Sequence, residues 1–161
     1  MYLLSVEANT RKRVRTLAEL IPYNVAIYGP KEWMNLLPPE GADNCRGPLP
    51  YEQIPSLFAS SSINLNIHSL QCPSALNSRD FDILASGGFL LSDYVTEADA
   101  GLITHGRDAV FYRGIEDLKN QVEFYLSNEN ERKEIARHGH QTAINNHGFR
   151  SRAQQMLDAI L

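Results

Sequence analysis

The sequence predicts an α/β fold in which a doubly wound parallel sheet of about five strands is flanked by helices. Two observations predict it. Short apolar segments alternate with helical segments along the chain, and glycine, proline or asparagine stands at many of the boundaries between them. Strands that alternate with helices form parallel sheets covered on both faces. Because 161 residues suffice for one hydrophobic core, we expect residues 1–161 to form a single Rossmann-like domain.

The composition excludes several classes of protein. Hydrophobic residues make up 43% of the chain and charged residues 21%, which is typical of a globular domain. A net charge of -4 gives no reason to expect nucleic acid as a partner. Cys45 and Cys72 are too few for a disulfide framework and lack metal-ligand spacing. The chain has no apolar run of membrane-spanning length and no signal peptide, so we expect a cytoplasmic protein with reduced thiols.

The first fifty residues predict two strands and one helix. The run "YLLSVE" (2–7) indicates a strand, and "RKRVRTLAELI" (11–21) indicates a helix closed by Pro22. A second strand over 24–29 ends at the turn dipeptide Gly29-Pro30. Residues 31–50 are rich in proline and glycine with few periodic apolar positions, so we expect a long loop there.

The rest of the chain continues the alternation. "YEQIPSLFASS" predicts a short helix with Pro55 in its first turn, and a longer helix opens near Asn77 and ends at the pair Gly87-Gly88. Asn128 and the pair His147-Gly148 are expected to separate three C-terminal helices. The predicted strands are 63–67, 89–94 and 109–112, and the predicted C-terminal helices are 115–127, 129–146 and 149–160.

Ligands of open parallel sheets bind outside the carboxyl ends of the strands. That rule selects four candidate segments, which are Glu7–Arg13, Gly29–Trp33, His68–Arg79 and Asp93–Glu97.

Three cations follow the first predicted strand. Arg11, Lys12 and Arg13 fall near the start of the predicted helix, where the helix dipole disfavours positive charge. A phosphate at that terminus would reverse the balance, because it accepts from backbone N–H groups and pairs with the cations. The alternative is a solvated basic face. The chain contains no P-loop and no GxGxxG, so no ordinary dinucleotide site is predicted.

Two further segments carry polar groups near the ends of strands. Asn66 and His68 approach the carboxyl end of the third predicted strand, where they could face a ligand or bond a neighbouring loop. After them, Ser74 lies in a loop whose small residues allow close approach, and Asn77 or Ser78 can cap the next helix. On that helix, Arg79 could reach a phosphate and Asp82 could accept from ribose hydroxyls. The acids near this helix start are also favourable with no ligand at all.

One long segment of the chain resembles the C-terminal domain of group 1 glycosyl transferases, in particular the bacterial-type branch of CgeB-like spore-maturation proteins. The segment is "LPYEQIPSLFASSSINLNIHSLQCPSALNSRDFDILASGGFLLSDYVTEADAGL". The likeness continues through residues 105–157 and covers most of the chain. It implies one half of a GT-B fold, the half that holds a nucleotide-diphosphate sugar, and a chain that is part of a glycosyltransferase.

The resemblance also implies roles for individual residues. Many retaining members carry two glutamates with seven residues between them before an "A-x-G" segment. Aligning "DILASGG" on that segment puts the second glutamate, which binds ribose, at Asp82 and the first at Ser74. The diphosphate contacts correspond to Arg11, Lys12, Arg13, Ser78 and Arg79, and the sugar and its loop to Asn66, His68, Ser74 and Asn77. No catalytic residue is assigned, and no metal or cofactor is predicted.

A complete GT-B enzyme has an N-terminal half that binds the acceptor, so the resemblance implies such a domain or subunit as a partner. The other expected partner is a second copy of the chain, which would form a homodimer through the C-terminal helix. The alternative function is a catalytically inactive Rossmann-like module that acts as a subunit or in protein interactions. A phosphoacceptor receiver domain is disfavoured, because "INLNIHS" offers no acid after its strand.

Overall fold

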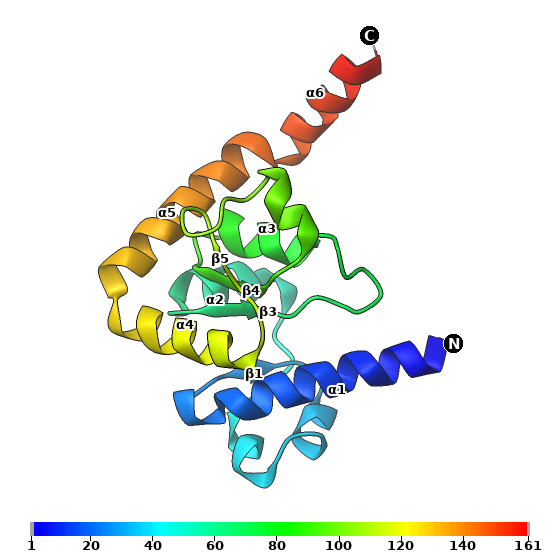
Figure 1. Cartoon of the computed structure of the whole chain (residues 1–161), viewed down its shortest axis with the longest axis vertical. Helices are drawn as coiled ribbons and strands as arrows, with labels where there is room; N and C mark the ends of the chain where they lie inside the picture. Colours follow the sequence, from blue (N-terminus) through cyan, green and yellow to red (C-terminus); the bar gives the residue numbers. More distant parts are fainter. Residues whose placement is uncertain (1, 161) are drawn as a thin grey trace.

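The computed structural model describes residues 2–160, with side chains from Ser5 onward (Figure 1). Its strands are β1 (Ile27–Tyr28), β2 (Cys45–Gly47), β3 (Asn64–Asn66), β4 (Leu90–Asp93) and β5 (Val110–Tyr112). Its α-helices are α1 (Tyr2–Leu20), α2 (Ile54–Ser60), α3 (Ser78–Ala85), α4 (Ile115–Ser127), α5 (Glu129–Asn146) and α6 (Phe149–Ile160). Short 3₁₀ helices are η1 (Ile21–Tyr23), η2 (Lys31–Asn35), η3 (Pro39–Asn44), η4 (Tyr51–Gln53) and η5 (Thr96–Ala100).

Helices cover both faces of the larger sheet, which confirms the α/β class. This sheet is parallel, with strand order β3-β4-β5. Side chains alternate along a strand, so neighbouring residues face opposite sides of the sheet. On one side, Leu90 and Phe111 pack in a cluster with residues of α2, α3 and α5. On the other side, Leu91 and Val110 pack in a second cluster with residues of α1, α4 and α5. The two apolar layers fix the sheet between its helices as in a Rossmann-like half.

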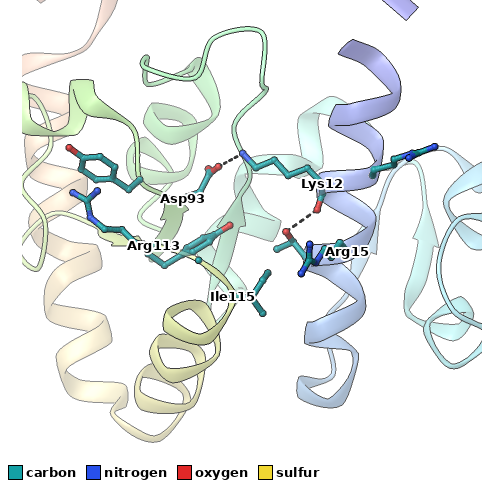
Figure 2. Close-up of a pocket in the computed structure, with 10 residues that line it drawn as sticks. Lys12, Arg15, Asp93, Arg113 and Ile115 are labelled. Carbon is teal, nitrogen blue, oxygen red and sulfur yellow. Dashed lines mark hydrogen bonds and ion pairs between the residues drawn. The ribbon is translucent and has the colours of Figure 1, made fainter. Parts of the chain in front are cut away.

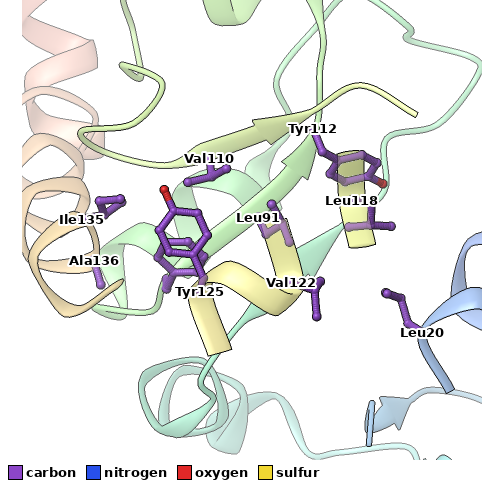
Figure 3. Close-up of a cluster of buried hydrophobic side chains, with 10 residues drawn as sticks. Leu20, Leu91, Val110, Tyr112, Leu118, Val122, Tyr125, Ile135 and Ala136 are labelled. Atoms are coloured by element: carbon purple, nitrogen blue, oxygen red, sulfur yellow. The ribbon is translucent and has the colours of Figure 1, made fainter. Parts of the chain in front are cut away.

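Figure 3 shows the second of these clusters at the junction of the sheet with α4. Leu118 and Val122 lie one helical turn apart on α4 and pack against Leu91 of β4. Leu20, at the end of α1, joins the same cluster. Since burial of each such side chain stabilises by about 1.5–3 kcal/mol, the burial of Leu20 helps to hold the end of α1 against the sheet.

The predicted strand at residues 2–7 is wrong, because these residues belong to α1. The helix runs unbroken from Tyr2 to Leu20 without an internal glycine or proline. Glu7 pairs with Arg11 at 2.5 Å across one helical turn, which joins the segment predicted as a strand to the one predicted as a helix. Arg11, Lys12 and Arg13 therefore lie in the middle of a helix, and the expected helix start beside them does not exist.

The strands are divided between two small sheets, whereas a single sheet of about five strands was expected. β2 lies within the predicted long loop and pairs in parallel with β1. Its neighbours in that loop are η2 and η3. Prolines 30, 38 and 39 start these two 3₁₀ helices at or before their first residues, which shows why the segment lacked a readable helical period.

Most of the remaining predicted boundaries are confirmed closely, although the strand predicted over 24–29 is confined to β1. α4, α5 and α6 occupy 115–127, 129–146 and 149–160, as expected. Asn77 caps α3 in a capping box with Asp80, and Gly87 adopts a left-handed φ of 78° just beyond the helix. In Figure 1, α6 extends away from the other elements. Within residues 2–160, no helix is both long enough and apolar enough to cross a membrane.

Gly139 tests the packing of α5 on the sheet. A Cβ atom there would lie 2.2 Å from the carbonyl oxygen of Asp108 and 2.7 Å from Leu84. We expect Gly139→Ala to lower the free energy of unfolding by about 2 kcal/mol, because overpacking against backbone outweighs the better helix propensity of alanine. Urea denaturation measures the loss. Gly148→Ala is the control, since its Cβ would lie 3.7 Å from the nearest atom. Equal stability of the two variants would contradict this packing.

Candidate functional site

The parallel register brings the polar strand ends to one edge of the larger sheet. Asn66 of β3 pairs with Ser92 of β4, and Asp93 pairs with Tyr112 of β5. The chain leaves all three strands at this edge, as the rule for ligand sites in such sheets requires. The segment after β3 returns as α3, and the one after β5 enters α4 directly.

A cavity of about 700 Å³ opens between this edge and α1 (Figure 2). Basic residues outnumber acidic ones in its lining, which contains four basic side chains and a single carboxylate. The volume is within the usual range for small-molecule sites, about 300–1,000 Å³. The lining residues are Arg11, Lys12, Arg15, Thr16, Asp93, Tyr94, Tyr112, Arg113, Gly114 and Ile115.

Lys12 is fixed at the inner wall of the cavity. Its Nζ atom donates to Asp93 Oδ2 at 2.6 Å and to the carbonyl oxygen of His68 at 3.0 Å. Asn9, nearly one turn earlier on α1, bonds the side chain of Ser69 and the backbone N–H of Leu70. These contacts hold α1 against the loop that follows β3. The position of Lys12 is therefore fixed both by its own hydrogen bonds and by those of Asn9.

Arg113 supplies the opposite wall. Its guanidinium group lies 3.2 Å from the centre of the Tyr94 ring, in cation–π geometry. The Tyr94 hydroxyl donates in turn to Asp99. The next residue, Gly114, has a φ of 85° and precedes α4 without a side-chain cap. The positive end of a thirteen-residue helix therefore borders the cavity together with Arg113.

Behind the cavity wall lies a buried carboxylate, that of Asp80 on α3. Its side chain is fully buried. Oδ1 accepts from Asn66 Nδ2 at 2.7 Å and from Ser92 Oγ at 3.3 Å. Oδ2 accepts from the backbone N–H of Asn77 at 2.9 Å and lies 2.8 Å from His68 Nε2. Each oxygen thus has two partners, which a buried charge requires.

His68 lies between two carboxylates. Its Nε2 atom meets Asp80, and its Nδ1 atom lies 2.7 Å from Asp93 Oδ1. Burial alone would lower the pKa of His68, but the hydrogen bonds and charges of Asp80 and Asp93 raise it to about 9. His68 is therefore an imidazolium at neutral pH and donates from both ring nitrogens. Burial would raise the pKa of Asp93, but bonds from His68 and Lys12 hold it below its ordinary value.

The structure divides the predicted phosphate residues into two groups. Arg11 and Lys12 line the cavity, whereas Arg13, on the same helix, is exposed and is not part of the lining. Ser78 and Arg79 are exposed at the start of α3, outside the cavity lining. The two groups share one edge of the sheet, with the Asp80–His68–Asp93 cluster behind the cavity wall.

The other predicted residues lie along the same edge. Asp82 is exposed on α3. Ser74 is exposed, and its carbonyl oxygen accepts from the backbone N–H of Glu97 at 2.9 Å. Asn77 caps α3 through the N–H of Arg79. Asn66 and His68 are buried, and their polar side-chain atoms bond within the protein. Contact of any of these with a donor remains a prediction.

Sequence reasoning did not select four residues that define the site. Arg15 and Arg113 line the cavity, and Asp80 and Asp93 hold His68. Asp93 lies in one of the four candidate segments at strand ends, and this position is the one signal in the sequence that points to it. The sequence places Asp80 only near a helix start, because its buried contacts lie 12 to 14 residues away in sequence.

The arrangement is suited to anion binding. Four cationic side chains and the start of α4 line a cavity whose one lining carboxylate, that of Asp93, is already paired, and among the four cations Arg11 is itself paired with Glu7. Within residues 2–160, no three His, Cys, Asp or Glu side chains are grouped so that they could hold a metal ion.

Comparison with known proteins supports the same class of function. A family model described as glycosyl transferase-like matches residues 9–158, nearly the whole chain. The protein therefore belongs to this glycosyl transferase-like family, and a general role in glycosyl transfer follows from that membership. A comparison with curated proteins gives no match.

The charged state of His68 predicts a pH dependence of stability. The pKa is raised from 6.5 to about 9 on folding, so its contribution is fully present below pH 6.5 and is lost as pH rises through about 9. At about 1.4 kcal/mol per pKa unit, the loss amounts to roughly 3 kcal/mol. Urea denaturation between pH 6 and pH 10 measures it. His68→Gln lacks the titrating group and should show a flatter profile; identical slopes would refute the assignment.

Proposed function

We propose that this chain is the donor-binding half of a glycosyltransferase and binds a nucleotide-diphosphate sugar at the carboxyl edge of β3, β4 and β5. One observation supports it above the others, namely the cavity with four cations at that edge. Membership of the glycosyl transferase-like family supports the same substrate class. The finer placement in the CgeB-like branch is part of this proposal.

In the proposed complex, the diphosphate occupies the cavity. Arg15 and Arg113 offer planar guanidinium groups that suit phosphate oxygens, and Lys12 offers a fixed ammonium group. A departing nucleoside diphosphate gains negative charge as the bond to the sugar breaks. Cations and helix N–H groups already held in place stabilise that charge without rearranging, which is how such a site assists the reaction.

The exposed residues of α3 take the remaining parts of the donor. Asp82 accepts from the ribose hydroxyls, and Ser78 with Arg79 contacts the phosphates from the side of α3. Ser74 and Asn77, in the loop and cap before α3, border the sugar. The buried Asn66 and His68 support this loop from below through Asp80.

A partner at α6 completes the proposal. The helix exposes large apolar side chains, with Phe149 98% and Ile160 79% accessible. Such side chains favour burial against another surface. An acceptor-binding domain or a second copy of the chain is the occupant that the family likeness suggests.

Thermal denaturation with nucleotide sugars tests donor binding. A UDP- or GDP-sugar at millimolar concentration should raise the melting temperature by mass action. Arg15→Ala and Arg113→Ala should each weaken binding by about tenfold, the effect of losing one charge-assisted phosphate contact. Arg13→Ala is the matched control, with the same change of charge on the same helix but outside the cavity lining. No shift with any nucleotide sugar would overturn the proposal.

Asp82→Ala separates ribose binding from phosphate binding. If Asp82 accepts from the ribose, the variant should bind the nucleotide sugar about tenfold more weakly and inorganic pyrophosphate with unchanged affinity. Isothermal titration calorimetry measures both ligands. Asp158→Ala, on the exposed face of α6, serves as the control for charge. A gain in pyrophosphate affinity, or unchanged nucleotide-sugar binding, would show that Asp82 acts otherwise.

A further inference from the structure

Lys12 differs from the other cations of the cavity because two groups of the protein already hold its ammonium. Nζ donates to Asp93 Oδ2 at 2.6 Å and to the His68 carbonyl at 3.0 Å. An ammonium group has three N–H donors, so one remains for a ligand. The side chain is 32% exposed, so the free donor can be reached from the cavity. The orientation of Lys12 therefore depends on how Asp93 is held.

Asp93 is held by His68. Oδ1 of Asp93 lies 2.7 Å from both the backbone nitrogen and the Nδ1 atom of His68, which leaves Oδ2 to face Lys12. On its far side, His68 is fixed by the fully buried Asp80. The four side chains form a row of alternating charge: Asp80 negative, His68 positive, Asp93 negative and Lys12 positive.

The net charge of these four side chains affects the electrostatic potential in the cavity. With His68 charged, the row is neutral, and Arg15 and Arg113 add two positive charges, while Arg11 is paired with Glu7. With an uncharged residue at position 68, the row carries a net negative charge directly behind the site proposed for the anion. Asp93 would then bind Lys12 without a competing cation and turn its positive charge away from the ligand.

We propose that His68 is a positioning residue of the anion site, which acts through Asp93 to orient Lys12 and to cancel the carboxylate charge at the cavity wall. The proposal rests on donor binding at this cavity. It gives the buried histidine a role that does not require contact with the donor.

The charged and titratable groups around His68 come from four elements. Asp80 faces it from α3, Asp93 from β4 and Lys12 from α1. Tyr112 of β5 borders Asp93, and burial with the charge of Asp93 raises the pKa of its hydroxyl far above the ordinary value, so it stays neutral. Ser92 is the uncharged neighbour, 3.3 Å from Nδ1.

A double-mutant cycle tests whether His68 acts through Lys12. Pyrophosphate affinity is measured by calorimetry at pH 7.5 for the full chain and for His68→Gln, Lys12→Met and the double variant. Each single variant should lose about tenfold, and the double variant should lose clearly less than the hundredfold that independent effects would give, because His68 can orient Lys12 only where Lys12 is present. Lys133→Met, an exposed lysine on α5, is the matched control and should bind normally.

The outcomes distinguish this inference from the proposed function. Binding by the unaltered chain with additive losses in the cycle overturns the positioning role alone. No binding of pyrophosphate or of any nucleotide sugar by the unaltered chain overturns the proposed function, and the positioning role with it. Circular dichroism and melting temperatures establish that each variant is folded at the temperature of the titration.

A second measurement covers the case in which His68→Gln does not fold. Because coupling is reciprocal, an anion that binds better when His68 is charged must raise its pKa, by one unit for a tenfold coupling. The ring signals of His68 are followed by NMR from pH 7 to pH 11 in sodium sulfate and in sodium chloride of equal ionic strength. Sulfate keeps its charge over this range. The rise should appear in the unaltered chain and be clearly smaller in Lys12→Met; an unchanged pKa in the unaltered chain, or an equal rise in both, overturns the positioning role.

Discussion

The carboxylate of Asp80 is the constraint on which the carboxyl edge of the sheet depends. A buried, unpaired carboxylate destabilises a protein by several kcal/mol, so every group around Asp80 is fixed by the need to compensate it. Asn66 ends β3 there, the N–H of Asn77 starts α3 there, and His68 is kept protonated. The same side chain therefore joins a strand end, a helix start and a charged histidine into one rigid unit.

From that unit, the charge order extends outward to the surface. His68 fixes Asp93, Asp93 fixes Lys12, and Lys12 reaches a cavity that also receives two arginines of α1 and Arg113. The cations come from segments about 100 residues apart, and the apolar cluster around Leu91 and Leu118 holds those segments together. Packing on one face of the sheet thus determines the electrostatics at its edge.

The sequence was most informative where one local signal dominates. β4, β5 and the three C-terminal helices were predicted because apolar alternation and breaks at Asn128 and His147-Gly148 agree with each other. The segment 2–7 was mispredicted because a short apolar run is compatible with either a strand or a helix. The helix prevails here because no glycine or proline interrupts the segment up to Leu20.

For the site, the sequence predicts the carboxyl edge of the sheet and some of the residues there, but not the contacts between those residues. Lys12 and His68 were candidates on local grounds, yet their link through Asp93 depends on the strand register, which no spacing in the sequence reports. Arg113 was missed for the same reason: it reaches the cavity only because β5 lies beside β4 and leads straight into α4.

The alternating row also limits how sequences of this kind can diverge. Loss of His68 alone leaves two carboxylates facing each other, and loss of Asp80 alone leaves a buried polar cluster without its acceptor. Either single step gives a less stable protein before a second change can compensate it. Descendants of this chain are therefore expected to inherit Asp80, His68 and Asp93 as a set or to lose all three together.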